Sequence, residues 1–180
     1  MTEKVALWIT VVVLCAAASR AESPQPGEYQ VKAAFLYNFA KFVEWPARAL
    51  PSTSPSMTLC VLGDDPFDRD LEQTVQGKTV GGRELVIKRF KVMQGLTACH
   101  ILFISASESR RLPQILAGLK GSHVFTVGDT EQFTELGGMI NFVVQENKIR
   151  FEINVDAAER AALRLSSKLL KLAKRARPRK

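Results

Sequence analysis

The pattern of apolar positions is clearest in residues 28–46, EYQVKAAFLYNFAKFVEWP, where it predicts a helix rich in aromatic side chains. At helical spacing, one apolar stripe contains Val31, Phe35, Phe39 and Phe42, and a second sector beside it contains Tyr29, Leu36, Ala40 and Val43. Pro46 and Pro51 are expected to end the helix, because proline cannot donate a backbone hydrogen bond. More than half of the circumference is apolar. The helix therefore either lies between two layers of its own domain or offers its second face to a partner.

From residue 57 onward, short apolar runs alternate with helical patterns, which is typical of an α/β domain. Strands that are covered on both faces of a parallel sheet are short and almost uniformly apolar, as these are. We expect strands near residues 57–62, 84–90, 100–105 and 123–127, and helices near residues 66–76, 107–120 and 129–136. The predicted fold class is α/β: a single three-layer domain with a mainly parallel sheet, a terminal antiparallel hairpin and flanking helices.

The C-terminal part predicts that hairpin and one last helix. Residues 139–144 and 148–154 are expected to pair as antiparallel strands around a turn at Glu146-Asn147. In the second strand apolar residues alternate with Arg150 and Glu152, so one face is buried and the other carries charges. The last helix is expected to begin with Asn154 or Asp156 as its N-cap. Its apolar stripe is Val155, Ala158, Ala162, Leu165, Leu169 and Leu172.

The first 21 residues have the pattern of a cleaved secretory signal peptide. Lys4 provides the positive start, and residues 5–18 form an uncharged run that is short for a membrane span. We expect cleavage after Ala21, with Ala18 as the alternative, and Cys15 would be removed with the signal. An uncleaved membrane anchor is the competing interpretation.

Removal of the signal leaves roughly 160 residues, which is the length of one domain. We expect this domain to cover residues 22–173 and to be followed by a basic tail, residues 174–180. The formal charge of +7 falls to +6 without the signal, and six positive charges lie near the end of the chain: Lys171, Lys174, Arg175, Arg177, Arg179 and Lys180. An exported protein has little occasion to meet nucleic acid. An anionic membrane surface or an acidic partner therefore fits the tail better, and a solvated tail without a partner is the alternative.

Two cysteines remain in the exported chain, and they form a candidate disulfide in an oxidising compartment. Cys60 lies in the predicted strand 57–62, and Cys99 begins the apolar run of another predicted strand. If these strands are neighbours, a bridge would close a loop of about 40 residues and stabilise the fold by about 2–4 kcal/mol. Two buried free thiols are the alternative.

Small and polar residues follow three of the predicted strands. In open α/β sheets, ligands bind in the crevice outside the carboxyl ends of the strands. The candidate ligand crevice consists of Asp64, Asp65, Ser105, Ser107 and Asp129. Ordinary turn and N-cap chemistry is the alternative, because strand-to-helix turns require the same residue types.

Familiar catalytic motifs are absent from the sequence, including a nucleophile elbow, a P-loop, a dinucleotide-binding glycine motif and C-x-x-C. His100 and His123 each open an apolar strand without Cys, Asp or Glu at metal-ligand spacing. We therefore interpret both as strand-end residues and expect no metal site. Asp64 and Asp65 are adjacent, and neighbours on one turn seldom converge on one substrate atom. The sequence argues against an enzyme, and no cofactor is expected.

Several sequence blocks, taken in order, make a specific resemblance. They are YQVKAAFLYNFAKFVEWP, LCVLGDDPF, GKTVGGREL, CHILFIS, HVFTVGD, FTELGGMINFV and RFEINVDAAERAALRLSSKLLKLA. Together they cover nearly all of the exported chain, which resembles the YfiR family of periplasmic proteins. The resemblance implies a periplasmic α/β regulator that represses a membrane-bound diguanylate cyclase by binding its periplasmic sensor segment. Release of the cyclase would raise cyclic di-GMP inside the cell and favour biofilm formation.

The resemblance also bears on the cysteines. Cys60 in LCVLG and Cys99 in CHILFIS match the positions of a family disulfide. Some relatives carry a second cysteine pair around the GG-M-I-x-F block, whereas residues 133–142 of this chain contain none. Redox control through a second bridge is therefore not implied for this chain.

For contact with an inner-membrane diguanylate cyclase or another membrane sensor protein, we predict a surface on the opening helix and the last strand. It contains Phe35, Tyr37, Phe39, Phe42, Arg150 and Glu152. The sequence also allows a homodimer and a contact between the basic tail and a membrane surface. The competing function is a small-molecule-binding module linked to an outer-membrane uptake system or another membrane signalling system. An enzyme with an unrecognised site is a third class.

Overall fold

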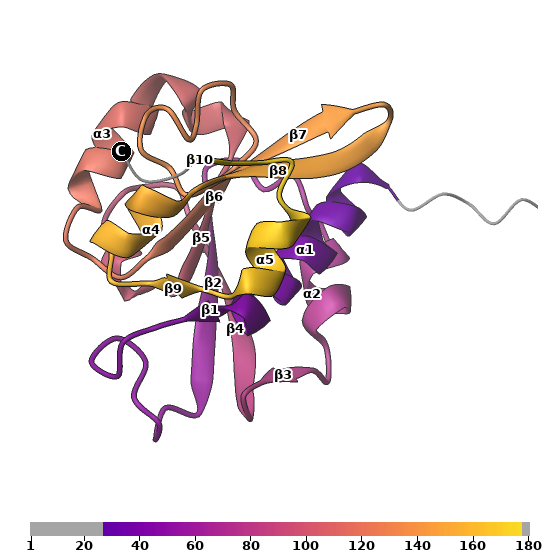
Figure 1. Cartoon of the computed structure of the whole chain (residues 1–180). Helices are drawn as coiled ribbons and strands as arrows, with labels where there is room; N and C mark the ends of the chain where they lie inside the picture. The colour runs from indigo at the N-terminus through magenta and orange to yellow at the C-terminus, as the bar shows by residue number, and fades with distance from the viewer. Residues whose placement is uncertain (1–26, 178–180) are drawn as a thin grey trace, which may run out of the picture.

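The computed structural model describes residues 27–177 (Figure 1). The predicted signal peptide lies outside the described residues, as do residues 178–180 of the predicted tail. The helical segments are α1 (Glu28–Phe42), α2 (Asp70–Val75), η1 (Leu96–Ala98), η2 (Ala106–Arg111), α3 (Leu112–Gly118), α4 (Val155–Arg160) and α5 (Ser167–Leu172), where η marks a 3₁₀ helix. The strands are β1 (Val43–Glu44), β2 (Ser56–Leu62), β3 (Thr79–Val80), β4 (Arg83–Phe90), β5 (Ile101–Ile104), β6 (Phe125–Gly128), β7 (Ile140–Gln145), β8 (Lys148–Asn154), β9 (Arg164–Leu165) and β10 (Arg175–Arg177).

The main sheet of the described residues has the strand order β10-β8-β7-β6-β5-β2-β4-β3. Its centre is parallel, because β2 pairs in parallel with β4 and β5, β5 with β6, and β6 with β7. β8 and β3 join their neighbours antiparallel, and β1 pairs with β9 in a separate small sheet. The predicted α/β class with a mainly parallel sheet and a terminal hairpin is confirmed.

The central strands β2, β5 and β6 are buried on both faces, and this explains why they are mostly apolar, whereas β4 has several exposed positions. In β2, Leu59 and Val61 pack with α1, α2 and α5, whereas Cys60 and Leu62 pack with α3 on the opposite face. Side chains alternate across a strand, so helices on both faces bury residues 59–62 of β2, whereas Ser56 and Thr58 are half-buried. Figure 1 shows α1, α2 and α5 on one side of the sheet and α3 on the other.

Helix α1 packs one face into the core of its own domain, and Gln30, Ala34 and Lys41 remain exposed on its outer face. Leu36 and Ala40 are fully buried, and Phe39 is 1% exposed. The helix ends at Phe42, earlier than the proline at residue 46 suggested, because Val43 adopts an extended conformation and pairs with Leu165 of β9. Pairing with a distant strand therefore decides where this helix stops.

The helix predicted near residues 129–136 is wrong, because this segment forms turns. Phe133 of this segment is fully buried, and its ring lies directly against Gly128 and Gly138, where an added Cβ would collide with it. Gln132 adopts a positive φ of 60°, which interrupts helical geometry. Burial of one aromatic ring on the α3 face thus overrides the helical pattern.

The single last helix is also wrong, because the segment forms α4 and α5 separated by β9. Asn154 is the N-cap of α4, as predicted, and its side chain accepts a hydrogen bond from the Ala157 amide at 3.0 Å. Ala162 adopts a φ of 57°, and the Leu163 amide donates to the Ala158 carbonyl at 2.9 Å, which is the Schellman way of ending a helix. Ser166 then caps α5.

The two other predicted helices are present in altered form. The segment near residues 66–76 is helical only over α2, and the segment near residues 107–120 begins as the 3₁₀ turn η2 and continues as α3. Pro113 lies at the start of α3, where its missing N–H is not needed.

Candidate functional site

The two cysteines form a disulfide across the centre of the sheet. Cys60 lies in β2, and Cys99 directly precedes β5, the parallel neighbour of β2. Their Cα atoms are 6.0 Å apart, and the bridge joins positions 39 residues apart in the chain. Both residues are buried, in the layer that faces α3. The bridge favoured from the sequence is confirmed, and the free thiols are excluded.

The predicted crevice residues share one edge of the sheet, because β2, β5 and β6 are parallel neighbours. The two aspartates after β2 bind basic side chains there. Asp64 pairs with Lys91 at 2.8 Å, in an exposed contact, and Asp65 pairs with Arg89 at 2.5 Å. Arg89 also binds Glu72 at 2.7 Å, and this hydrogen bond lowers the pKa of Glu72. These aspartates therefore act mainly in ion pairs and turns.

The two serines after β5 stabilise the turns of the same edge. The Ser107 hydroxyl accepts a hydrogen bond from the Asp64 amide at 2.9 Å, and Ser105 is the N-cap of η2. Gly63 adopts a φ of 92°, which brings its backbone close to the side chains of Ser107 and Glu108. The serines fit the capping alternative.

Asp129, which follows β6, is at the centre of a buried charged cluster. Its Oδ2 atom accepts hydrogen bonds from Lys32 Nζ at 2.6 Å and from the Tyr29 hydroxyl at 3.1 Å. Lys32 Nζ also lies 2.6 Å from Glu28 Oε1, one helical turn earlier. The side chains of Lys32 and Asp129 are only 3% and 8% exposed. Of the five predicted crevice residues, Asp129 is the one held by side chains of α1.

The cluster shifts the pKa of both side chains that α1 directs toward Asp129. Burial alone would lower the pKa of Lys32, but its hydrogen bonds to Asp129 and Glu28 outweigh burial, and the pKa is raised. Burial, followed by the negative charge of Asp129, raises the pKa of Tyr29. Lys32 is therefore a permanent cation that neutralises a buried carboxylate.

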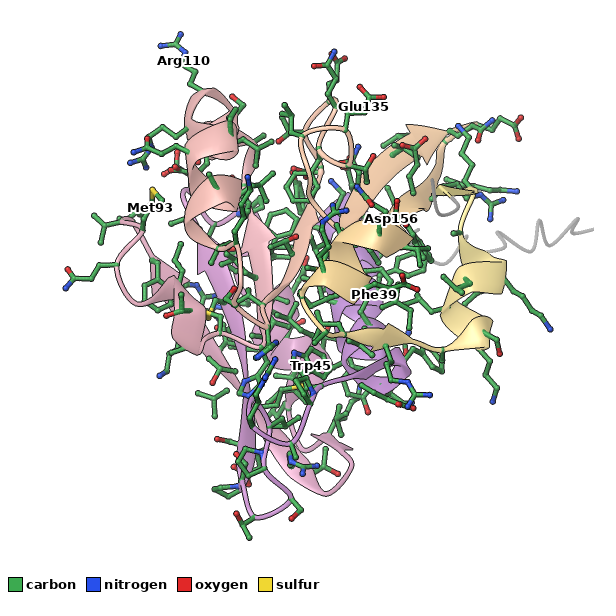
Figure 2. All side chains as sticks on the ribbon, turned by 60° about the vertical axis from the view of Figure 1, so that its left-hand side comes forward. Phe39, Trp45, Met93, Arg110, Glu135 and Asp156 are labelled. Atoms are coloured by element: carbon green, nitrogen blue, oxygen red, sulfur yellow. A yellow bond between two sulfur atoms is a disulfide. The ribbon has the colours of Figure 1, made fainter. Side chains whose placement is uncertain are left out.

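The aromatic residues predicted to bind a partner do not form one surface. The prediction that Phe39 lies on the partner-binding surface is wrong, because Phe39 is buried. Its ring packs against Phe125, Phe142 and Phe151 at centroid distances of 6.1, 5.8 and 5.2 Å. Figure 2 shows Phe39 inside the molecule, whereas Arg110 points away from it. A side chain that fills the core is not available to a partner of the folded domain.

The remaining aromatic residues of α1 are half-buried and point in different directions. Phe35 packs against Phe142 and Phe151 of the hairpin, whereas the Tyr37 hydroxyl donates to the Thr79 carbonyl of β3 at 3.4 Å. Phe42 packs at the margin of the core. The helix therefore divides these residues between two flanks.

Arg150 and Glu152 lie on the face of β8 opposite to Phe151. Arg150 is exposed and Glu152 is half-buried, as the alternation in sequence predicted for this strand. Val144 in the paired strand β7 is 60% exposed although it is apolar. Figure 1 shows the β7–β8 hairpin projecting from the body of the domain near the start of α1.

Neither histidine is placed as a metal ligand. His123 Nδ1 lies 2.7 Å from the Ala161 carbonyl, and Arg48 Nε donates to His123 Nε2 at 2.8 Å. In residues 27–177, no three His, Cys, Asp or Glu side chains converge to hold a metal ion. No helix in the same part of the chain is long and apolar enough to cross a membrane.

Comparison with known sequences decides the family. The sequence model described as YfiR/HmsC-like matches residues 29–174, which is most of the chain. The chain belongs to the YfiR/HmsC-like family. The family resemblance found in the ordered sequence blocks is thereby confirmed, and members of this family are regulators rather than known enzymes.

Solved structures resemble this YfiR/HmsC-like protein in fold alone. One is the ABC domain from Streptococcus pneumoniae in complex with L-Trp, with a TM-score of 0.52 and 11% identity, over 81% of this chain and 60% of that one. Another is a conserved domain protein from Vibrio cholerae O1 biovar El Tor, with a TM-score of 0.55 and 9% identity, over 83% of this chain and 60% of that one. The chain therefore spans less than two thirds of either structure.

Lys32 is not among the site residues predicted from the sequence, although the sequence contains a signal for it. It falls within the apolar sector of Tyr29, Leu36 and Ala40, where a charged side chain must be buried. Buried charges are paired, so its position indicates a carboxylate partner elsewhere in the chain. That this partner is Asp129 depends on the tertiary structure.

We expect removal of the disulfide to destabilise this YfiR/HmsC-like domain by about 2–4 kcal/mol, because the unfolded chain gains loop entropy. The test compares urea unfolding of the wild type with that of Cys60→Ala/Cys99→Ala. As a control, the wild type unfolded with a reductant should approach the double variant, which itself should not respond to the reductant. Equal unfolding midpoints for the oxidised wild type and the double variant would contradict the expectation.

His100 is expected to make the stability of the domain depend on pH. Its Nδ1 atom accepts a hydrogen bond from the Thr58 amide at 3.0 Å, so the neutral ring donates from Nε2 to the Ala49 carbonyl at 3.2 Å. Burial lowers the pKa of His100 below its ordinary value of 6.5. In the window below 6.5, the unfolded chain binds more protons than the folded one. The contribution of neutral His100 to the stability of the fold is therefore present above pH 6.5 and is lost as the pH falls.

The measurement is the free energy of unfolding at about pH 7.5 and about pH 5, for the wild type and for His100→Asn. Asparagine keeps one acceptor and one donor but does not titrate in this range. The wild type should lose more stability at the lower pH than the variant does. An identical loss in both proteins would assign the pH dependence to other groups.

Proposed function

We propose that this chain is a periplasmic regulator that binds the periplasmic sensor region of an inner-membrane diguanylate cyclase and represses it, lowering cyclic di-GMP. The observation that carries the proposal is membership of the YfiR/HmsC-like family over residues 29–174. The Cys60–Cys99 disulfide supports it, because such bridges persist in oxidising compartments. In this proposal residues 1–21 are a cleaved signal, residues 22–173 are the regulatory domain, and the basic tail, of which Arg175–Arg177 joins the sheet as β10 beside β8, faces an anionic membrane surface.

We place the contact surface on the β7–β8 hairpin rather than along α1. Val144 supplies exposed apolar area, and Arg150 supplies an exposed charge on the same hairpin. The half-buried Phe35 supports the hairpin from beneath through its contacts with Phe142 and Phe151. Val144 pairs with Ile149, whereas Arg150 pairs with Val143, so the two side chains project from opposite faces of the hairpin, and in this proposal the partner encloses both faces.

Repression by this surface is a population shift of the partner. A regulator that binds the inactive state of a cyclase about 100-fold more tightly than the active state biases the equilibrium by about 2.7 kcal/mol. Such a difference is within reach of a small protein interface, since single interface residues contribute more than about 1 kcal/mol. No catalytic group of the regulator is needed for this effect.

The test is the amount of cyclic di-GMP in the native host after deletion of the gene. We expect deletion to raise the amount of cyclic di-GMP. Expression of the full chain should lower it to the original amount, whereas expression of a chain without residues 1–21 should not. An unchanged amount after deletion would contradict repression of a cyclase. Restoration by the chain without residues 1–21 would contradict the periplasmic location.

The contact surface is tested by Val144→Asp and Arg150→Glu in the same assay. Val92→Asp is the matched control, because the Val92 side chain is 59% exposed, much like that of Val144, and lies in the segment between β4 and η1, outside the hairpin. We expect the two hairpin variants to lose repression while Val92→Asp keeps it, with all three exported in equal amounts. Full repression by both hairpin variants would show that the partner binds elsewhere.

A further inference from the structure

A cavity of about 630 Å³ opens at the carboxyl end of β6, between α1 and the β7–β8 hairpin. Gly128 at the end of β6 pairs with Asn141, and β7 continues beyond this pair to Gln145. The shorter strand leaves room beside the longer one, at the edge where parallel sheets hold ligands. The side chains that matter here are Glu28, Tyr29, Lys32, Asp129, Asn141 and Glu152.

Two buried oxygen atoms in the lining have no hydrogen-bond partner. They are Oδ1 of Asp129 and Oδ1 of Asn141. Asn141 is 6% exposed, and the side chain of Asp129 is 8% exposed. Buried acceptors without a donor are rare in folded proteins, because each one costs free energy. Both atoms are acceptors, so a ligand that satisfies them must bring donors.

The charge of the lining indicates the same kind of ligand. Glu28, Asp129, Glu131 and Glu152 contribute four negative charges, and Lys32 contributes one positive charge. Lys32 is already bound to Glu28 and Asp129, which leaves Glu131 and Glu152 without an ion pair to the side chains of residues 27–174. The cavity is therefore acidic although the whole chain carries a formal charge of +7. Such a local field attracts cations.

The aromatic residues of the lining already hold a cation. Lys32 Nζ lies 4.3 Å from the ring centroid of Tyr29 and 5.9 Å from that of Phe142. The Tyr29 ring thus lies beside a positive charge at the cavity, whereas Phe142 is only 3% exposed and belongs to the core. In the described part of the chain, no three carboxylates gather closely enough to hold a metal ion.

From these observations we propose that the cavity binds a linear organic diamine or polyamine. One ammonium group donates to Oδ1 of Asp129 and Oδ1 of Asn141, which supplies the missing donors. A second ammonium group lies against Glu152 or Glu131, and the methylene chain between the two ammonium groups passes beside Tyr29. This ligand class goes beyond the proposed repression, and the binding does not require a membrane partner.

The test is isothermal titration of the purified exported chain with spermidine and putrescine at low ionic strength. We expect saturable binding of one molecule per chain, which weakens at high salt because charges are screened. Butylamine, with one ammonium group, should bind roughly tenfold more weakly than putrescine, since it lacks the second charge-assisted contact. Equal affinities for butylamine and putrescine would overturn the two-ammonium proposal.

Variants locate the binding in this cavity. Asn141→Leu removes one of the two unpartnered acceptors, and Glu152→Gln removes a charge while keeping the shape of the side chain. We expect both to weaken spermidine binding roughly tenfold. Glu84→Gln is the matched control, because Glu84 is an exposed strand residue in β4, far from the cavity in the sheet order, and it should leave the affinity unchanged.

The proposal is overturned if no saturable binding of either polyamine is found, or if all variants bind as the wild type does. Glu152→Gln keeps the test decisive if Asn141→Leu fails to fold, because Glu152 is half-buried and outside the core. The readout is binding by the purified protein. An absence of polyamine binding would not contradict repression of a cyclase. An absence of repression in the host would not contradict polyamine binding.

Discussion

Replacement of Phe39 by alanine is expected to lower the free energy of unfolding by about 3–5 kcal/mol, because a large ring is removed from the core. Phe39 is 1% exposed, and its ring contacts Phe35, Phe125, Phe142 and Phe151. These residues come from α1, β6, β7 and β8. Truncation would therefore leave a cavity where one helix and three strands meet, and rigid neighbours cannot collapse into it.

The measurement is urea unfolding followed by circular dichroism, with two comparison variants. Phe39→Leu should lose much less stability, because most of the volume is kept. Phe35→Ala removes the same atoms from a half-buried position of the same helix and should also lose less. If Phe39→Ala were no less stable than Phe35→Ala, the packing of Phe39 between α1 and the three strands would be wrong.

Replacement of Lys32 by methionine is expected to lower the free energy of unfolding by about 3–5 kcal/mol, because it leaves the buried carboxylate of Asp129 without its cation. Lys32 Nζ lies 2.6 Å from Asp129 Oδ2, and the Asp129 side chain is 8% exposed. Methionine matches the apolar stem of lysine, so the loss reports mainly on charge. The tie between α1 and the end of β6 depends on this pair.

A double-mutant cycle separates the charge from the packing. Lys32→Met/Asp129→Asn should be more stable than Lys32→Met alone, because an amide is less costly to bury than an unpaired carboxylate. Arg164→Met is the control for a surface pair: Arg164 lies 3.8 Å from Glu44, and both side chains are largely exposed. Its effect should stay within about 0.5 kcal/mol. A loss of similar size in Arg164→Met and Lys32→Met would contradict the role of burial.

The disulfide shows how far sequence reasoning reaches for a site. The predicted export signal and the two cysteines that follow it favoured a bridge, and strand patterns placed Cys60 and Cys99 in or beside two strands. That these strands are parallel neighbours is a property of the sheet order, which local periodicity does not encode. The pairing was therefore predictable, whereas its place between β2 and α3 was not.

The partner surface shows the opposite outcome. An aromatic helix pattern indicates which residues avoid water, but it does not indicate whether the water is displaced by a partner or by the same chain. In the fold, the hairpin of β7 and β8 covers Phe35 and Phe39. Phe39 therefore belongs to the core, and the exposed apolar residue of the hairpin strands is Val144, which the sequence pattern alone did not single out.

The sequence by itself determined the α/β class, the positions of the central strands, the terminal hairpin and the family of this protein. These features depend on local periodicity, turn residues and ordered sequence blocks, all of which are properties of neighbouring positions. The tertiary structure alone decided where α1 and the last helix end, because β1 and β9 pair across the chain. It also decided that Lys32 binds Asp129 and that Asn141 faces a cavity, because contacts between residues about 100 positions apart arise only when the sheet has assembled.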